Sequence, residues 1–162
     1  TLKPVKADVL LQVRDLQGKV AFEQKLSATV PANSAKCIRS YDLSKLAPEP
    51  ASRFMTLDAK LAGKSFRNEH FFTAWKKYEF LKTEIKLKTR AVKEGFEVIL
   101  ATDRPAFYAS LSAEGVSGEF DDNCFTLLPG ERKSVVFKPR TDVSTAEFKK
   151  ALTVKHLRET YA

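Results

Sequence analysis

Apolar and polar side chains alternate along most of this chain with a period of two. In the first half the alternation runs through residues 7–13, 20–30 and 55–61, and a turn at 15–19 separates the first two runs. Alternation with this period is typical of strands with one buried face, and two runs joined by a short polar turn predict a β-hairpin. The first half is therefore predicted to be a β domain.

The second half contains four short apolar runs that turn residues separate from one another. The runs cover residues 96–101, 106–111, 124–128 and 134–137, and the turns are TDRP at 102–105, EG at 114–115 and PGE at 129–131. A further alternating run at 85–91 precedes them. Short strands between regularly spaced turn signals indicate an antiparallel sandwich or barrel. We expect a second β domain here.

Several connecting segments give less regular patterns. We predict a strand at 36–41, a loop at 42–53 with one helical turn at 43–46, and a long aromatic strand at 71–80. Near the end we predict a polar loop at 140–146, followed by a last strand with Leu152, Val154 and His156. The fold class is thus all-β, with two tandem β-sandwiches that meet near residue 82.

Composition excludes several protein classes. The chain has 162 residues, of which 43% are hydrophobic, and it contains twelve Phe and only six Gly. This composition argues against disorder, and no run approaches the eighteen apolar residues of a transmembrane helix. The chain opens on Thr1 and shows no leader, so we expect it to be a piece of a longer protein.

The charge is concentrated in the first half. Residues 1–82 hold 15 Lys and Arg against 8 Asp and Glu, whereas residues 83–162 hold 13 against 12. A basic domain with interleaved aromatic residues at 71–78 allows a nucleic-acid surface. The lysines are dispersed, however, and no nucleic-acid motif is present. We therefore interpret them as a solvated basic face and expect no nucleic-acid partner.

Metal and disulfide chemistry find little support in the sequence. Cys37 and Cys124 fall in different predicted domains, without a second Cys or a His nearby, so we expect both to be buried and no disulfide to join them. The run Asp121-Asp122-Asn123 offers three oxygen side chains, but a calcium loop spaces its ligands more widely. We interpret it as a turn in which Asn123 caps backbone groups, and expect no metal or cofactor.

Candidate binding residues are aromatic. Trp75, Tyr78 and Tyr108 are flat side chains with a polar group, which suits stacking on a sugar ring; the alternative is that they fill the core or a contact between domains. On an alternating strand one of Phe107 and Tyr108 should point outward. His70 and His156 lack a neighbouring nucleophile, so no catalytic residue is assigned.

The second half contains the segments TDRPAFY at 102–108, GEFDDN at 118–123, FTLLPGE at 125–131 and LRETY at 157–161. In this order they resemble the C-terminal immunoglobulin-like domain of β-mannosidases, in the glycoside hydrolase family that also contains β-galactosidase. The preceding sandwich of that family ends in segments similar to NEHFF at 68–72 and WKKYEF at 75–80. The resemblance implies immunoglobulin-like domains at 1–82 and 83–162, the first of which is expected to lack an edge strand.

The resemblance also implies a function. The parent enzyme would hydrolyse terminal non-reducing β-D-mannose with retention of configuration, using paired glutamates on a separate (β/α)₈ barrel. A barrel of about 250 residues exceeds this chain, so the chain itself would be non-catalytic. Its partners would be that barrel and the other parent domains, and the resemblance allows an oligosaccharide contact and a homodimer. A secreted, periplasmic or lysosomal location would fit.

Two alternatives remain open. Related exo-glycosidases such as β-glucosaminidases share the domain plan, and their substrate choice is made on the barrel. A carbohydrate-binding module is the second alternative, which an independent affinity for manno-oligosaccharides would favour.

Overall fold

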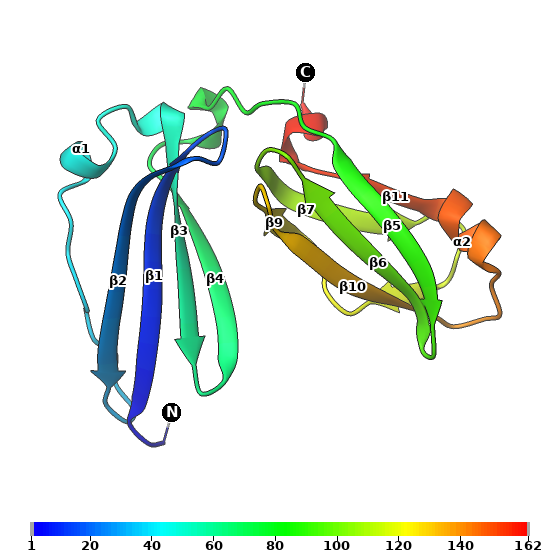
Figure 1. The fold of residues 1–162 in the computed structure, drawn as a ribbon, viewed down its shortest axis with the longest axis horizontal. Coiled ribbons are helices and arrows are strands. Elements are labelled where there is room, and N and C mark those ends of the chain that lie inside the picture. Colours follow the sequence, from blue (N-terminus) through cyan, green and yellow to red (C-terminus); the bar gives the residue numbers. More distant parts are fainter. Residues whose placement is uncertain (1, 162) are drawn as a thin grey trace. The chain divides into compact units, whose positions relative to one another are not determined.

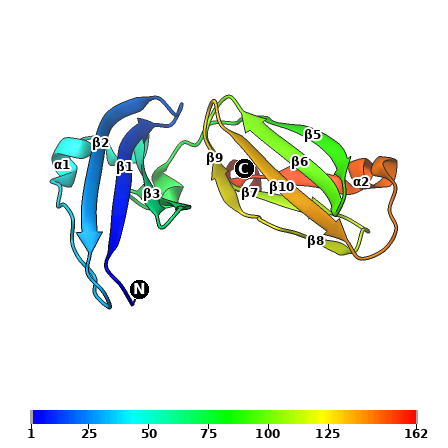
Figure 2. The same cartoon turned by 60° about the horizontal axis from the view of Figure 1, so that its bottom comes forward.

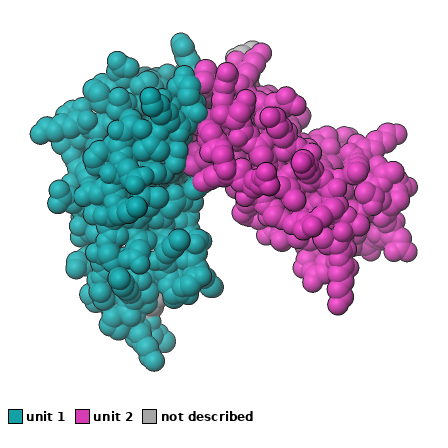
Figure 3. Space-filling model, in the orientation of Figure 1, with its two compact units in different colours: residues 1–79 teal, residues 80–162 magenta. Residues whose placement is uncertain are grey.

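The computed structural model describes residues 2–161 and divides the chain into two compact units, residues 1–79 and 80–162 (Figure 3). Nearly all regular structure is antiparallel β-sheet, which confirms the predicted all-β class (Figure 1). No helix among residues 2–161 is long and apolar enough to cross a membrane.

Unit 1 is built on one four-stranded sheet with the order β2-β1-β3-β4. Its elements are β1 (Val5–Asp15), β2 (Val20–Val30), α1 (Leu43–Leu46), η1 (Pro50–Ser52), β3 (Arg53–Leu61), β4 (Lys64–Phe71) and η2 (Trp75–Lys77). The predicted first hairpin is confirmed: in its turn the Asp15 carboxylate accepts hydrogen bonds from the amides of Gln17 and Lys19, at 3.0 and 2.9 Å. The predicted strand at 55–61 and the helical turn at 43–46 are also confirmed.

One face of this sheet holds an apolar cluster of unit 1. The register places Val13 between Phe22 of β2 and Met55 of β3, and Leu11 opposite Leu57. Leu46 of α1 packs on the same cluster, and the Tyr41 hydroxyl donates to the Gln24 side-chain oxygen at 2.5 Å. Among the residues described, the segment 41–46, rather than a second sheet, thus packs on this apolar cluster.

Two predicted strands of unit 1 were wrong. Residues 36–41 form no ladder, and residues 36–40 are exposed; a strand needs a partner for its amides, and alternation over six residues does not supply one. The aromatic segment 71–80 leaves the sheet after Phe71, and the amide of Tyr78 then donates to the Trp75 carbonyl at 2.9 Å within a 3₁₀ turn. The spacing of three between Trp75 and Tyr78 fits this turn, in which residues three apart lie on one side.

Unit 2 is a sandwich of two antiparallel sheets, β5-β6-β10-β8 and β11-β7-β9 (Figure 2). Its elements are β5 (Ile85–Val92), β6 (Gly95–Thr102), β7 (Ala106–Ala113), β8 (Gly118–Phe120), β9 (Phe125–Leu127), β10 (Arg132–Pro139), α2 (Thr145–Ala151), β11 (Leu152–Lys155) and η3 (Leu157–Thr160). The four apolar runs predicted between 96 and 137 are all strands. The predicted last strand ends at Lys155, one residue before His156.

The core of unit 2 is aromatic and aliphatic, and a helix closes one side of it. Phe148 of α2 stacks on Phe96 of β6 with ring centroids 4.4 Å apart, and on Phe137 of β10 at 5.0 Å. Val98, Leu100 and Val135 belong to the same buried cluster. The prediction contained no helix here. The loop predicted at 140–146 gives way at Thr145 to α2, which begins with a capping box between Ser144 and Glu147.

Candidate functional site

The aromatic candidates Trp75 and Tyr78 flank one short turn in unit 1. Trp75 is half exposed, and its ring meets the edge of Phe71 at 5.9 Å. Tyr78 is buried; its hydroxyl donates to the Arg53 carbonyl and accepts from the Phe72 amide, both at 2.9 Å. Burial raises the pKa of Tyr78, against the opposing effect of the backbone hydrogen bond from Phe72. Tyr78 therefore holds η2 against β3, and Trp75 presents the more accessible ring.

Tyr108 lies in unit 2, at a bulge in β7. The pairing of β7 with β9 shifts register between Ala106 and Ala109, and Tyr108 between them has a φ of +53°. An aromatic residue with positive φ is rare, and a bulge of this kind re-aims a side chain. Phe107 is 3% exposed while Tyr108 is only partly buried, in agreement with the prediction that one of the two points outward.

Several carboxylates of unit 2 are engaged in ways that favour their charged form. Glu97 accepts hydrogen bonds from Arg90 and from the Ser134 hydroxyl, which lower its pKa. The Lys138 ammonium, 2.7 Å away, lowers the pKa of Glu94 in the same way. The capping box lowers the pKa of Glu147 through hydrogen bonds from Ser144. A glycosidase general acid needs a raised pKa instead.

The polar run at 121–123 serves backbone groups. Asn123 accepts from the Leu111 amide at 2.8 Å and donates to the Leu111 carbonyl at 2.9 Å, while an Asp121 oxygen accepts from the Val136 amide. Asp122 pairs with Lys133. The interpretation of Asn123 as a cap is confirmed, and no group of His, Cys, Asp or Glu that could hold a metal occurs in residues 2–161.

The prediction that both cysteines are buried was wrong, because Cys37 and Cys124 are exposed. Cys37 lies in the segment that forms no strand, and Cys124 has a φ of +59° at the end of the 121–123 turn. The strand predicted around Cys37 does not form, and β9 begins at Phe125, one residue after Cys124.

A pocket of about 380 Å³ in unit 2 was not predicted. Its lining residues come from the beginning and the end of the unit 2 sequence: Lys82, Thr83, His156, Arg158, Glu159 and Tyr161. His156 is 3% exposed, and its ring Nε2 lies 3.2 Å from the Thr83 carbonyl oxygen. In the sequence, only the family resemblance of LRETY singles out the segment 157–161. Its contact with residues 82–83 is long-range, so local patterns give no signal for it.

Comparison with known families accounts for both halves. Residues 80–160 match the mannosidase family model described as an Ig-fold domain. The chain belongs to the mannosidase Ig-fold family. Residues 1–77 match a second model, described as a Mannosidase Ig/CBM-like domain. These mannosidase Ig-fold units are thus accessory domains of the mannosidase type, as the sequence segments indicated.

Solved structures show the same fold over nearly the whole chain. A β-D-mannosidase from Dictyoglomus thermophilum matches with a TM-score of 0.78 and 19% identity, covering 97% of this chain and 19% of that one. The exo-chitosanase CsxA of Amycolatopsis orientalis matches with a TM-score of 0.54 and 16% identity, covering 96% and 23%. This chain therefore spans about a fifth of the length of these two proteins. No curated protein sequence matches it.

Proposed function

We propose that this chain forms non-catalytic accessory domains of a β-mannosidase and stabilises a separate catalytic (β/α)₈ barrel of the parent enzyme. The observation that supports this most directly is the likeness to a β-D-mannosidase over 97% of the chain, at a TM-score of 0.78. One domain alone could have been exchanged between unrelated proteins. Likeness across both units favours a shared domain order, and hence a shared parent type.

Three carboxylates of unit 2 are engaged in a way that does not suit a general acid. Glycoside hydrolysis uses two carboxyl groups about 5–9.5 Å apart, one of which must hold a proton at working pH. The carboxylates of Glu94, Glu97 and Glu147 have lowered pKa values, because each is hydrogen-bonded within unit 2. Such groups act as structural anions. The paired acids of the parent, which would hydrolyse terminal β-D-mannose with retention, would lie on the barrel.

Two alternatives have a specific observation in their favour. The likeness to an exo-chitosanase supports a parent that releases glucosamine, although its TM-score of 0.54 is below that of the β-D-mannosidase. The half-exposed ring of Trp75 supports a carbohydrate-binding module, because an accessible indole can stack on a sugar.

Two assays test the role. The 162-residue chain should release no p-nitrophenol from p-nitrophenyl β-D-mannoside, and deletion of residues 1–162 from the parent should lower the melting temperature of the remaining barrel. Turnover by the chain alone would disprove the non-catalytic role. An unchanged melting temperature would disprove the stabilising role.

Titration calorimetry with mannobiose and mannotriose tests the binding-module alternative. Trp75→Ala removes the candidate ring, and Phe66→Ala is the matched control, because Phe66 is 54% exposed against 50% for Trp75 in the same unit. We expect no saturable heat from the unaltered chain. Saturable binding that Trp75→Ala abolishes and Phe66→Ala retains would instead establish a sugar platform.

A further inference from the structure

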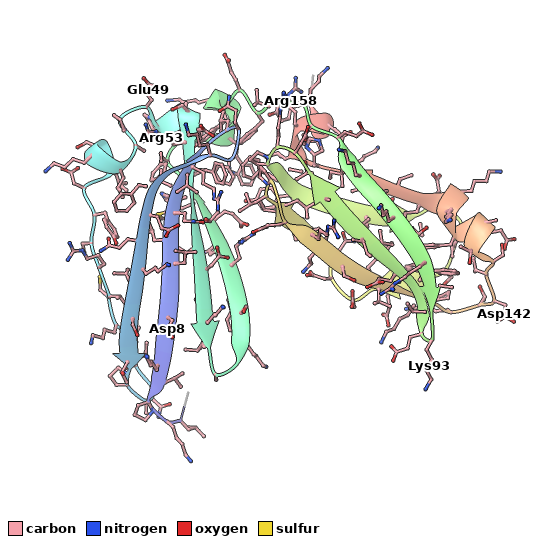
Figure 4. The ribbon with its side chains drawn as sticks, in the orientation of Figure 1. Asp8, Glu49, Arg53, Lys93, Asp142 and Arg158 are labelled. Carbon is pink, nitrogen blue, oxygen red and sulfur yellow. The ribbon has the colours of Figure 1, made fainter. Side chains whose placement is uncertain are left out.

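The pocket at the C-terminal turn of unit 2 has a chemistry that the accessory role does not use. Its lining comes from the η3 turn and from the segment just before β5, and its volume is about 380 Å³. Small-molecule sites commonly range over about 300–1,000 Å³, so the pocket is large enough for one sugar ring. Figure 4 shows Arg158 projecting from this turn.

The walls of this pocket are held in place by hydrogen bonds on both sides. The Thr83 carbonyl is bonded to the buried His156 ring at 3.2 Å, and Arg104 donates to the Lys82 carbonyl at 3.3 Å. On the other side the His156 amide donates to the Glu159 carboxylate at 2.9 Å. The backbone around the pocket is therefore fixed before a ligand arrives, which lowers the entropy cost of binding.

The pocket has an excess of positive charge. Among the described residues that line it, Lys82 and Arg158 are the cations and Glu159 is the carboxylate, which already accepts the His156 amide. Within residues 2–161 neither Lys82 nor Arg158 forms an ion pair. Arg158 uses Nη1 for the Tyr161 carbonyl at 2.9 Å, so its other N–H groups remain for a ligand.

An aromatic ring stands beside these cations. The Arg158 guanidinium lies over one face of the Tyr161 ring, 5.0 Å from its centroid, and Tyr161 is 43% exposed. A planar ring next to a guanidinium offers a stacking surface and a bidentate carboxylate partner at once. A ligand that satisfies both has a flat or cyclic body and one negative charge.

We propose that this pocket binds a single acidic sugar residue, a hexuronate, with its carboxylate on Arg158 and Lys82 and its ring against Tyr161. A neutral hexose would leave both cations without a partner. A phosphate ion would leave the Tyr161 ring unused. The site lies wholly in unit 2 and does not depend on the nature of the parent enzyme.

The test is an NMR titration of the ¹⁵N-labelled chain with D-glucuronate and D-mannuronate, beside D-glucose, D-mannose and inorganic phosphate at equal ionic strength. We expect saturable shifts of the amides of residues 82–83 and 156–161 with the uronates. The neutral sugars and phosphate should bind at least about tenfold more weakly, a difference of roughly 1.4 kcal/mol.

Arg158→Gln and Lys93→Gln form a matched pair of variants. Each removes one positive charge, and Lys93 lies at the opposite end of unit 2 (Figure 4). Arg158→Gln should weaken uronate binding by about tenfold or more, whereas Lys93→Gln should leave it within about twofold. Equal binding of mannose or of phosphate, equal effects of the two variants, or no saturable shift in a well-dispersed spectrum would overturn the proposal.

Discussion

The ring Nε2 of His156 lies 3.2 Å from the carbonyl oxygen of Thr83, which precedes it by 73 residues. This hydrogen bond joins the last turn of unit 2 to the segment that leads into its first strand. His156 is 3% exposed, so its ring has little contact with water that could take over the bond.

His156→Ala should therefore lower the free energy of unfolding of unit 2 by about 2–3 kcal/mol, since it leaves the Thr83 carbonyl unpaired and opens a cavity. Amide hydrogen exchange, followed in the unit that carries each substitution, measures this loss. His70→Ala is the control: His70 is exposed on β4 and contacts the Phe72 ring at its edge, so its loss should cost about 0.5 kcal/mol or less. Equal costs for the two variants would contradict the bracing role of His156.

Gly95 begins β6 where no side chain fits. Its φ is +138°, and an added Cβ would lie 2.2 Å from the Phe137 carbonyl oxygen and 2.6 Å from Pro139 Cδ. Gly95→Ala should lower the stability of unit 2 by more than about 2 kcal/mol, because backbone must move. At Gly115 φ is +76°, but no atom lies within 4 Å of an added Cβ. Gly115→Ala should therefore lower the stability by only about 1 kcal/mol. Thermal unfolding of both variants checks the difference; a Gly115→Ala loss as large as that of Gly95→Ala would refute the steric account.

The hairpin between β3 and β4 contains a residue that is poorly suited to its conformation. Ala62 and Gly63 form its turn with φ values of +48° and +77°, and such turns favour Asn-Gly. Ala62→Asn should raise the stability of unit 1 by about 0.5–1 kcal/mol, measured by urea unfolding followed through Trp75 fluorescence. Gly63→Ala should change stability in the opposite direction. A lower urea midpoint for Ala62→Asn would be inconsistent with this reading of the turn.

The Asn123 side chain extends the hydrogen bonding of β7 beyond its short pairing with β9. β9 pairs with β7 only at Ala106 and Ala109, and the Asn123 side chain then bonds both backbone groups of Leu111. Asn123→Ala should cost about 2 kcal/mol and speed hydrogen exchange at the Leu111 amide. Asp122→Ala, which removes the exposed pair with Lys133 and the hydrogen bond that Asp122 accepts from the exposed Asn123 amide, should cost about 1 kcal/mol or less and leave the Leu111 amide protected. Unchanged protection in Asn123→Ala would rule the ladder role out.

Glu97 should titrate below the usual carboxyl value of 4.5, because Arg90 and Ser134 hydrogen-bond its charged form. Its contribution to stability is then present above the unfolded pKa and is lost as pH falls through the folded pKa. Carbon-detected NMR titration measures this value, and Arg90→Gln should raise it. Glu94, which pairs with Lys138, should keep its lowered pKa in that variant. An unchanged Glu97 titration in Arg90→Gln would mean that the ion pair has no effect.

Alternating strands could be predicted because burial of one sheet face imposes a period of two, as in Val9, Leu11 and Val13 of β1. The strand at 36–41 was wrong because alternation does not reveal whether a neighbouring strand exists. The helix α2 was missed although Ser144 and Glu147 have capping-box spacing, since only the fold shows that Phe148 fills the sandwich. The lining of the pocket joins residues 82–83 to 156–161, and no local pattern reports such a contact.

The His156–Thr83 bond also bears on how unit 2 responds to mechanical load. β5 runs away from this bond and β11 runs toward it, and each is the outer strand of its own sheet. A force applied between residues 83 and 156 would therefore peel each strand from one end, breaking ladder hydrogen bonds one after another instead of shearing them together. Unit 2 would extend at low force once the His156 contact had opened.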